Sequence, residues 1–242
     1  CMHEASMHLR NCSITVTYDE DHVPSNGSLE PREFSKFLKR LRYHLGGGIR
    51  FFAAGEYGPL HLRPHYHALI FGHDFTEDRE FKRTNDYGDP LYVSPFLNAR
   101  WARGEITIGD LTFESAAYVA RYTLKKITGK MALEAYERVD PNTGEFYHVV
   151  PEYAVMSRRP GIGAPWIRRF YSDVYPVDEV VYNGKKFRPP KYYDTFVEEA
   201  ELTRLKAKRE ERATKHTITD KQRRVKERVV RRRLRRQQRR EQ

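Results

Sequence analysis

Two short runs of apolar and aromatic residues decide how this chain can fold: Ile49–Ala54 (IRFFAA) and Pro64–Phe71 (PHYHALIF). Each has the length of an ordinary strand and is bounded by turn-forming residues. Three glycines, Gly46–Gly48, precede the first run, and the short segment Gly55–Leu62 links the two. Because a link this short suits a hairpin, we predict that the two strands are antiparallel neighbours.

The segments on either side supply further strands and helices. A strand is expected at Ser13–Tyr18, where β-branched residues alternate, and a helix from Pro31 to about Leu45, where apolar residues follow helical spacing. The other expectations are a surface loop at Asp74–Pro95, a strand at Glu105–Ile108, a helix from Thr112 to about Ile127, a strand at Phe146–Val155 and a long polar helix over about Tyr193–Gln242. This order predicts an α+β domain with a central, mainly antiparallel sheet and flanking helices.

Composition excludes several classes of protein. The 242 residues are 39% hydrophobic and 13% aromatic, which is enough for a core and excludes a fully disordered chain. No apolar run reaches the roughly 18 residues of a membrane span, and the polar start does not resemble a signal peptide. Two cysteines, Cys1 and Cys12, cannot form a disulfide framework, which indicates a reducing compartment. Because position 1 is Cys rather than Met, we expect further residues upstream.

The net charge of +11 is concentrated at one end of the chain. Residues 201–242 hold 18 Lys and Arg against 6 Asp and Glu, whereas residues 1–200 carry a net charge of −1. The densest basic block consists of Arg231, Arg232, Arg233, Arg235 and Arg236. Such a segment is either a solvated or self-associating helix or a site that binds nucleic-acid phosphates, and we favour the second interpretation.

A His-x-His pair lies on the second of the two deciding strands. His65 and His67 are two residues apart, so on a strand both imidazoles point to one face and Tyr66 points to the other. Two imidazoles that converge from one face can hold one divalent metal ion. The pair alone is a weak motif, since it also occurs on ordinary solvated strands.

A carboxylate is available to complete that site. Glu56 follows the first of the two strands, so antiparallel pairing brings it near the histidines. Two histidines and a carboxylate leave coordination positions open for water or substrate, and oxygen donors suit Mg²⁺ or Mn²⁺. His61 is the rival third ligand.

Two tyrosines and two lysines lie together on the helix expected from Thr112. Tyr118 and Tyr122 are spaced i and i+4, which places them on one helix face, and Lys125 and Lys126 follow one turn later. Neighbouring ammonium groups favour the phenolate form of a tyrosine and attract a phosphate. Tyrosines at this spacing more often only pack, but beside a metal site they can attack a phosphodiester.

The combination resembles the HUH-type rolling-circle replication initiators, in particular the initiator endonucleases of small single-stranded DNA phages, the microviruses and gokushoviruses. The segments that carry the resemblance are Ser13–Asp19, Gly55–Gly58, Arg63–His67, Tyr118–Tyr122 with Lys125 and Lys126, and Met156–Gly163. The resemblance implies an HUH endonuclease domain over residues 1–183, followed by a linker at 184–200 and a basic helical tail at 201–242. It also implies that His65 and His67 bind the metal and that Tyr118 and Tyr122 are nucleophiles.

The activity implied is nicking and joining of single-stranded origin DNA through a 5′-phosphotyrosine, which starts and ends rolling-circle replication in the cytoplasm of a bacterial host. Arg158 and Arg159 are further candidates for binding DNA phosphates. No Gly-rich nucleotide-binding loop is present, so a host helicase and DNA polymerase are expected as partners. The alternatives are a non-catalytic nucleic-acid-binding module and a metal-dependent phosphohydrolase without a covalent tyrosine.

Overall fold

Strand β1 (Asn11–Thr17) is the central strand of the structure, and its sequence explains why. Its residues alternate between half-buried polar and fully buried apolar side chains, so Cys12, Ile14 and Val16 all lie on one face. It pairs antiparallel with β3 (Pro64–Phe71) on one side and with β6 (Ile106–Asp110) on the other. The expected strands at Ser13–Tyr18 and Pro64–Phe71 are thereby confirmed.

The computed structural model describes residues 1–58, 61–125, 129, 131–140, 142–175, 177–215 and 219–240, and the side chains of 122–125, 215 and 234–240 lie outside the described part. The chain divides into two compact units, Cys1–Trp166 and Ile167–Gln242.

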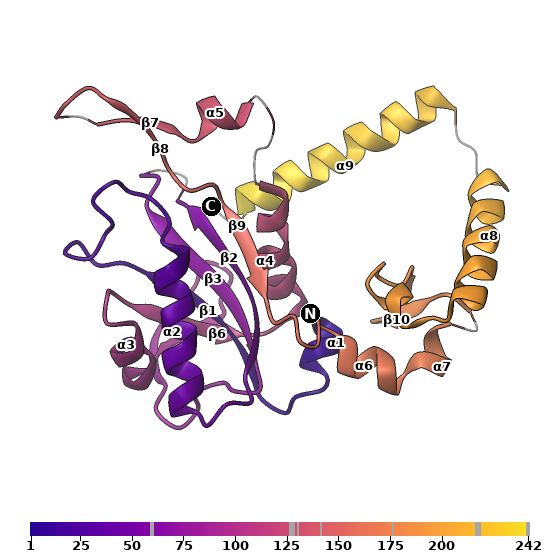
Figure 1. The fold of residues 1–242 in the computed structure, drawn as a ribbon, viewed down its shortest axis with the longest axis horizontal. Coiled ribbons are helices and arrows are strands. Elements are labelled where there is room, and N and C mark those ends of the chain that lie inside the picture. The colour runs from indigo at the N-terminus through magenta and orange to yellow at the C-terminus, as the bar shows by residue number, and fades with distance from the viewer. Residues whose placement is uncertain are drawn as a thin grey trace. The chain divides into compact units, whose positions relative to one another are not determined.

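A seven-stranded antiparallel sheet organises the first unit. The strands run in the order β4-β5-β6-β1-β3-β2-β9 (Figure 1). The remaining members are β2 (Arg50–Tyr57), β4 (Glu80–Thr84), β5 (Pro90–Val93) and β9 (Tyr153–Met156). Strands β2 and β3 pair antiparallel along their whole length, as predicted. The α+β class with a mainly antiparallel sheet is therefore confirmed.

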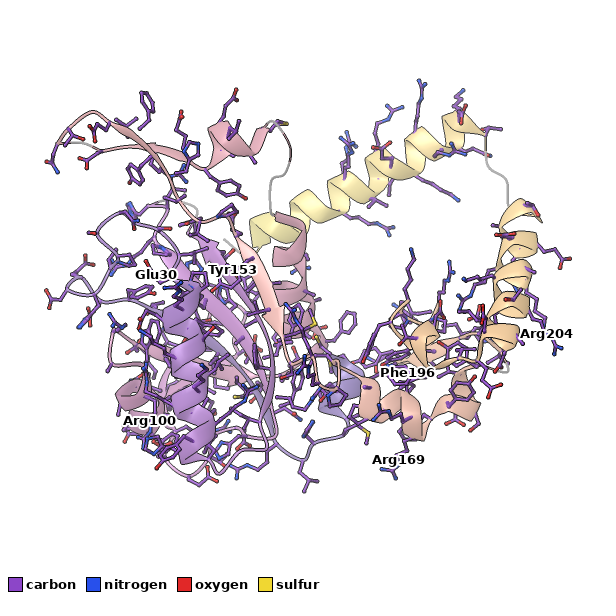
Figure 2. The ribbon with its side chains drawn as sticks, viewed as in Figure 1. Glu30, Arg100, Tyr153, Arg169, Phe196 and Arg204 are labelled. Carbon is purple, nitrogen blue, oxygen red and sulfur yellow. The ribbon has the colours of Figure 1, made fainter. Side chains whose placement is uncertain are left out.

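One face of the sheet packs against helices α2 (Pro31–His44) and α3 (Pro95–Trp101). Helix α2 starts at its proline, which suits the first turn, and it buries Phe34, Phe37, Leu38 and Leu41, one apolar stripe at helical spacing. Glu30 and Arg100 lie near opposite ends of this helix (Figure 2). On the same face, the Tyr66 hydroxyl accepts a hydrogen bond from the Glu30 amide at 2.9 Å, which ties β3 to the start of α2.

The other face packs against helices α1 (Met2–Ala5) and α4 (Phe113–Lys125). Figure 1 shows α2 on one side of the strands and α4 on the other. Ala116 and Val119 of α4 lie in one buried cluster with Phe52, Leu69 and Phe71 of the sheet. Further along β2 and β3, the residues on this face change from apolar to Glu56, His65 and His67. This change from apolar to polar places a chemical site beside a packed core.

The expected loop at Asp74–Pro95 is wrong, because the segment contains the hairpin of β4 and β5. All five residues of β4 are exposed and those of β5 are half-buried, so the segment has the polar composition of a loop. Asn85 holds the turn between the strands by accepting hydrogen bonds from the amides of Tyr87 and Asp89. Pairing of β5 with β6 then makes the hairpin the edge of the sheet.

The single strand expected at Phe146–Val155 is also wrong. The structure has β8 (Phe146–His148), which pairs with β7 (Glu137–Val139), and β9, which pairs with β2. Pro151 lies between the two strands and has no amide hydrogen for a sheet ladder. A short helix, α5 (Met131–Ala135), precedes β7.

The second unit contains helices α7 (Tyr171–Val174), α8 (Glu199–Lys215) and α9 (Asp220–Arg240), strands β10 (Val180–Tyr182) and β11 (Lys185–Phe187), and a 3₁₀ turn at Tyr193–Phe196. Helix α6 (Ala164–Arg169) spans the boundary between the units. Arg209 of α8 donates hydrogen bonds to Asp178 and Asp194, and Leu205 is buried. Helix α8 is thus docked within this unit, whereas residues 220–233 of α9 are exposed.

Within the described part of the chain, no helix is both long and apolar enough to cross a lipid bilayer.

A buried ion pair joins the N-terminal helix to the sheet. Glu4 of α1 has no exposed side-chain surface, and its carboxylate accepts hydrogen bonds from Arg50 of β2 and from the Gly163 amide at 2.6 Å. Arg50 also donates to the carbonyls of Pro160 and Gly161. Three segments far apart in the sequence therefore meet at one carboxylate.

We predict that Glu4→Ala lowers the free energy of unfolding by about 3–5 kcal/mol, because it leaves Arg50 without its carboxylate partner. Urea denaturation followed by circular dichroism measures the change. As a control, Lys36→Gln removes an exposed ion pair with Glu33 and should cost less than about 1 kcal/mol. Equal stability of Glu4→Ala and the unchanged protein would show that the pair does not hold α1 to the sheet.

Candidate active site

Glu56, His65 and His67 meet on the α4 face of the sheet. Glu56 lies opposite His65 in the β2–β3 register, and His67 lies opposite Ala54. The Nε2 atoms of His65 and His67 are 2.7 and 3.0 Å from the same oxygen, Oε1 of Glu56. One nitrogen from each ring and one carboxylate oxygen lie within 4.8 Å of one another, and such a group could hold a metal ion.

The donor set fits a divalent cation. Two donors that bind one cation at about 2.1 Å and at a right angle are about 3 Å apart, close to the separations observed here. Burial by itself would raise the pKa of Glu56, which is 4% exposed, but hydrogen bonds with His65 and His67 outweigh it and lower the pKa to about 2. The carboxylate is therefore anionic at neutral pH, and two nitrogens and one charged oxygen face a common point.

The outer nitrogens of both imidazoles have partners as well. Nδ1 of His65 is 3.1 Å from the backbone carbonyl of Arg63, and Nδ1 of His67 is 3.0 Å from the hydroxyl of Thr15. Thr15 did not emerge as a site residue from the sequence. The available signal was the alternation of hydroxyl residues Ser13, Thr15 and Thr17 along β1, which any half-exposed strand can show.

Tyr118 lies beside the histidines. Its ring is edge-on to that of His67, with centroids 5.0 Å apart and an interplanar angle of 89°. Thr112 and Ser115 hold the start of α4 through reciprocal hydrogen bonds between side chain and backbone, as the expected Thr112 cap requires. Because Ala116 and Val119 pack onto the sheet, the helix presents Tyr118 toward His67.

The other residues expected on this helix are less fully described. Tyr122 and Lys125 belong to α4, with Tyr122 one turn after Tyr118, but their side chains lie outside the described part. Lys126 lies outside the described residues altogether.

The rival ligand His61 is exposed in the link between β2 and β3. Among the described residues, the group of potential ligand atoms on this face contains Glu56 and not His61. Register explains the difference, because Glu56 is still inside the paired part of β2 whereas His61 follows its end.

Arg158 and Arg159 are exposed in the turn after β9, at the other end of β2. Ser157 donates its amide hydrogen to Phe51, which is five residues before Glu56. At about 3.3 Å per strand residue, this turn is about 17 Å along the strand from Glu56. The structure therefore does not bring these two arginines to the histidines.

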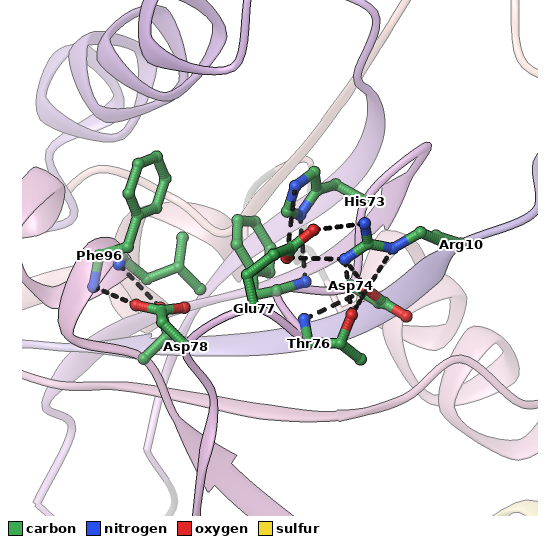
Figure 3. A network of polar contacts seen from close by, with 10 residues as sticks. Arg10, His73, Asp74, Thr76, Glu77, Asp78 and Phe96 are labelled. Carbon is green, nitrogen blue, oxygen red and sulfur yellow. Dashed lines mark hydrogen bonds and ion pairs between the residues drawn. The ribbon is translucent and has the colours of Figure 1, made fainter.

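His73, Asp74 and Glu77 form a second group with metal-ligand atoms. Figure 3 shows Arg10 between the two carboxylates, donating from Nε to Asp74 at 2.6 Å and from Nη1 to Glu77 at 2.5 Å. The guanidinium already neutralises this group and ties the segment after β3 to the start of β1. Nearby, Asp78 accepts a hydrogen bond from the Phe96 amide at the start of α3. These contacts hold the fold together.

Comparison with known proteins identifies the family. A family model for replication-associated proteins of the ORF2 type matches residues 11–127. The chain is 32% identical over 201 residues to "Replication-associated protein VP4" of Bdellovibrio phage phiMH2K, covering 79% of this chain and 59% of that protein. It is 32% identical over 229 residues to "Replication-associated protein ORF2" of Spiroplasma virus 4, covering 88% of this chain and 67% of that protein.

A third relative, "Replication-associated protein ORF4" of Chlamydia phage 1, is 34% identical over 134 residues, covering 51% of this chain and 32% of that protein. No solved structure shows significant similarity to the chain. The chain thus spans between about a third and two thirds of the length of these relatives. Phage replication proteins match both the part that carries the sheet and histidines and, in Spiroplasma virus 4, most of the chain. The chain belongs to the family of phage replication-associated proteins, the rolling-circle replication initiators of small phages.

Proposed function

We propose that this protein nicks and rejoins single-stranded DNA at the phage replication origin, using a divalent metal ion and a tyrosine nucleophile. The observation that carries the proposal is the convergence of Glu56, His65 and His67 beside the ring of Tyr118. Membership of a replication-associated family supports a DNA substrate. The sheet, the histidine pair and the tyrosine helix together support an HUH-type domain.

Three side chains would hold the metal: Glu56 through a carboxylate oxygen and His65 and His67 through Nε2. When bound, Mg²⁺ or Mn²⁺ would polarise the scissile phosphate and neutralise its developing charge. The two histidines and the carboxylate leave room for substrate oxygens, because all three come from two adjacent strands on one face.

The tyrosine would carry the covalent step. The phenol oxygen of Tyr118 or Tyr122 attacks phosphorus, a 5′-phosphotyrosyl bond forms, and the bond from phosphorus to the 3′ oxygen breaks. The phenol loses its proton to solvent and the departing oxygen gains one, so a free 3′-hydroxyl results. Attack by a second 3′-hydroxyl reverses these changes and joins the strands. Lys125 and Lys126 would favour the phenolate and the bound phosphate.

A covalent adduct with a single-stranded origin oligonucleotide distinguishes this function from its alternatives. A non-catalytic binding module retains DNA without a covalent bond, and a phosphohydrolase that activates water releases both ends. Denaturing electrophoresis after incubation with Mn²⁺ measures the adduct. An adduct supports the proposal, and cleavage without one would favour the phosphohydrolase.

We expect His67→Ala to reduce adduct formation at least about 100-fold while single-stranded DNA affinity changes little, because the metal acts mainly on the transition state. EDTA should abolish the adduct in the unchanged protein, and added Mn²⁺ or Mg²⁺ should restore it. His61→Ala is the comparison variant and should remain active. Loss of activity in His61→Ala together with normal activity in Glu56→Gln would exchange the third ligand.

The two tyrosines can be separated by removing only their hydroxyls. We predict that Tyr118→Phe combined with Tyr122→Phe forms no adduct, while at least one single variant still cleaves, since residues one helical turn apart can reach the same phosphate after a small substrate movement. Peptide mapping of the adduct by mass spectrometry identifies the residue. An adduct mapped elsewhere in the double variant would refute both assignments.

The basic helix α9 is proposed to hold the enzyme on DNA independently of sequence. Its described side chains are exposed, and its densest block consists of Arg231, Arg232, Arg233, Arg235 and Arg236. Val225, Val229 and Val230 are also exposed, so a self-association seam is the competing interpretation. The charge density favours DNA phosphates.

Deletion of residues 219–242 tests the role of α9 and spares Arg209, which docks α8. We predict weaker binding to all single-stranded sequences and a flatter dependence of log Kd on log salt, by about 0.7 for each lost phosphate contact. Cleavage of a short oligonucleotide at saturation should be nearly unchanged. An unaltered salt slope with a smaller mass in analytical ultracentrifugation would assign α9 to self-association instead.

A further inference from the structure

The hydroxyl of Thr15 sits behind the metal-facing side of His67. Thr15 on β1 lies directly opposite His67 on β3, and its Oγ1 is 3.0 Å from Nδ1 of the ring. The other nitrogen of that ring, Nε2, faces Glu56 at 3.0 Å. One imidazole is thus held between a hydroxyl on a neighbouring strand and the carboxylate of the site.

The chemistry of a metal ligand defines what that hydroxyl must do. A histidine that binds a cation through Nε2 presents a lone pair there and carries its hydrogen on Nδ1. That hydrogen needs an acceptor, and Thr15 Oγ1 lies at hydrogen-bond distance. A bond of this kind fixes both the orientation of the ring and the nitrogen that is free to bind.

The two histidines differ in how they are held. Nδ1 of His65 faces the backbone carbonyl of Arg63, which no side-chain substitution removes. Nδ1 of His67 faces a side chain, so a single substitution can test its support. Thr15 is itself constrained, because it lies on the central strand and its β-branched side chain has few rotamers.

We propose that Thr15 is a positioning residue for the metal site: its hydroxyl holds His67 in the tautomer and orientation that turn Nε2 toward Glu56. The proposal rests on the proposed metal dependence. It also bears on the nucleophile, since the Tyr118 ring packs edge-on against the same imidazole. A threonine at a strand position is otherwise explained by strand propensity alone, and valine serves that purpose equally well.

Thr15→Val therefore separates the two explanations, because it keeps the shape and removes the hydroxyl. The measurement is the Kd for Mn²⁺ of the DNA-free protein, followed by electron paramagnetic resonance. We expect Kd to rise about 10- to 100-fold, the usual effect of removing a partner of a metal-binding histidine. The Mn²⁺ concentration that gives half-maximal adduct should rise by a similar factor, and saturating Mn²⁺ should restore most of the rate.

Two further variants control the experiment. Thr15→Ser retains the hydroxyl and should bind Mn²⁺ within about threefold of the unchanged protein. Thr107→Val makes the same chemical change on β6, opposite Thr15 on its other side, and should have no effect on Mn²⁺ affinity. Should Thr15→Val fail to fold, the contrast between Thr15→Ala and Thr15→Ser carries the same test.

Unchanged Mn²⁺ affinity in Thr15→Val would overturn the proposal, and so would an equal loss in Thr107→Val, which would indicate a general effect on the sheet. If the unchanged protein itself binds no Mn²⁺, the proposed metal dependence fails and the role of Thr15 fails with it. A bound metal in the unchanged protein with no effect at Thr15 rejects only the positioning role.

Discussion

The antiparallel register of β2 and β3 is the constraint on which the rest of the site depends. It sets Glu56 opposite His65 and brings His67 to the same face two residues later. A shift of one residue would turn every side chain of a strand to the other face and separate the carboxylate from the imidazoles. Tyr66, between the histidines, opposes such a shift because it is buried on the other face and its hydroxyl bonds the Tyr18 hydroxyl and the Glu30 amide.

The site lies where an apolar contact surface ends. Along β3, Phe71 and Leu69 pack with α4, and the next residues on that face are His67 and His65. Burial makes an isolated carboxylate unfavourable, so Glu56 remains ionised there only because two histidines bond it. The position of Tyr118 depends on the same packing, since Ala116 and Val119 hold its helix against the sheet. Core packing and chemistry are thus coupled on this face.

The two units divide the requirements of a replication initiator in different physical ways. The first unit holds its candidate site through short, directional contacts that need a rigid sheet. The second carries the excess positive charge, and phosphate attraction needs charge density more than fixed geometry. Within that unit, Arg209 bonds Asp178 and Asp194 and keeps α8 in the fold, which leaves α9 as the exposed basic helix.

The local periodicities of the sequence determined the α+β class, the strands β1, β2 and β3, the shared face of His65 and His67, and the helix that carries Tyr118. These features follow from spacings of two and 3.6 residues, which depend on near neighbours alone. Tertiary structure decided that Glu56 rather than His61 meets the histidines, that Thr15 contacts His67, and that Arg158 and Arg159 lie at the far end of β2. It also made strands of Glu80–Thr84 and Pro90–Val93, because a polar edge strand owes its conformation to the neighbour it bonds. Strand pairing and register join residues far apart in the chain, and no local pattern specifies which distant partner each strand will find.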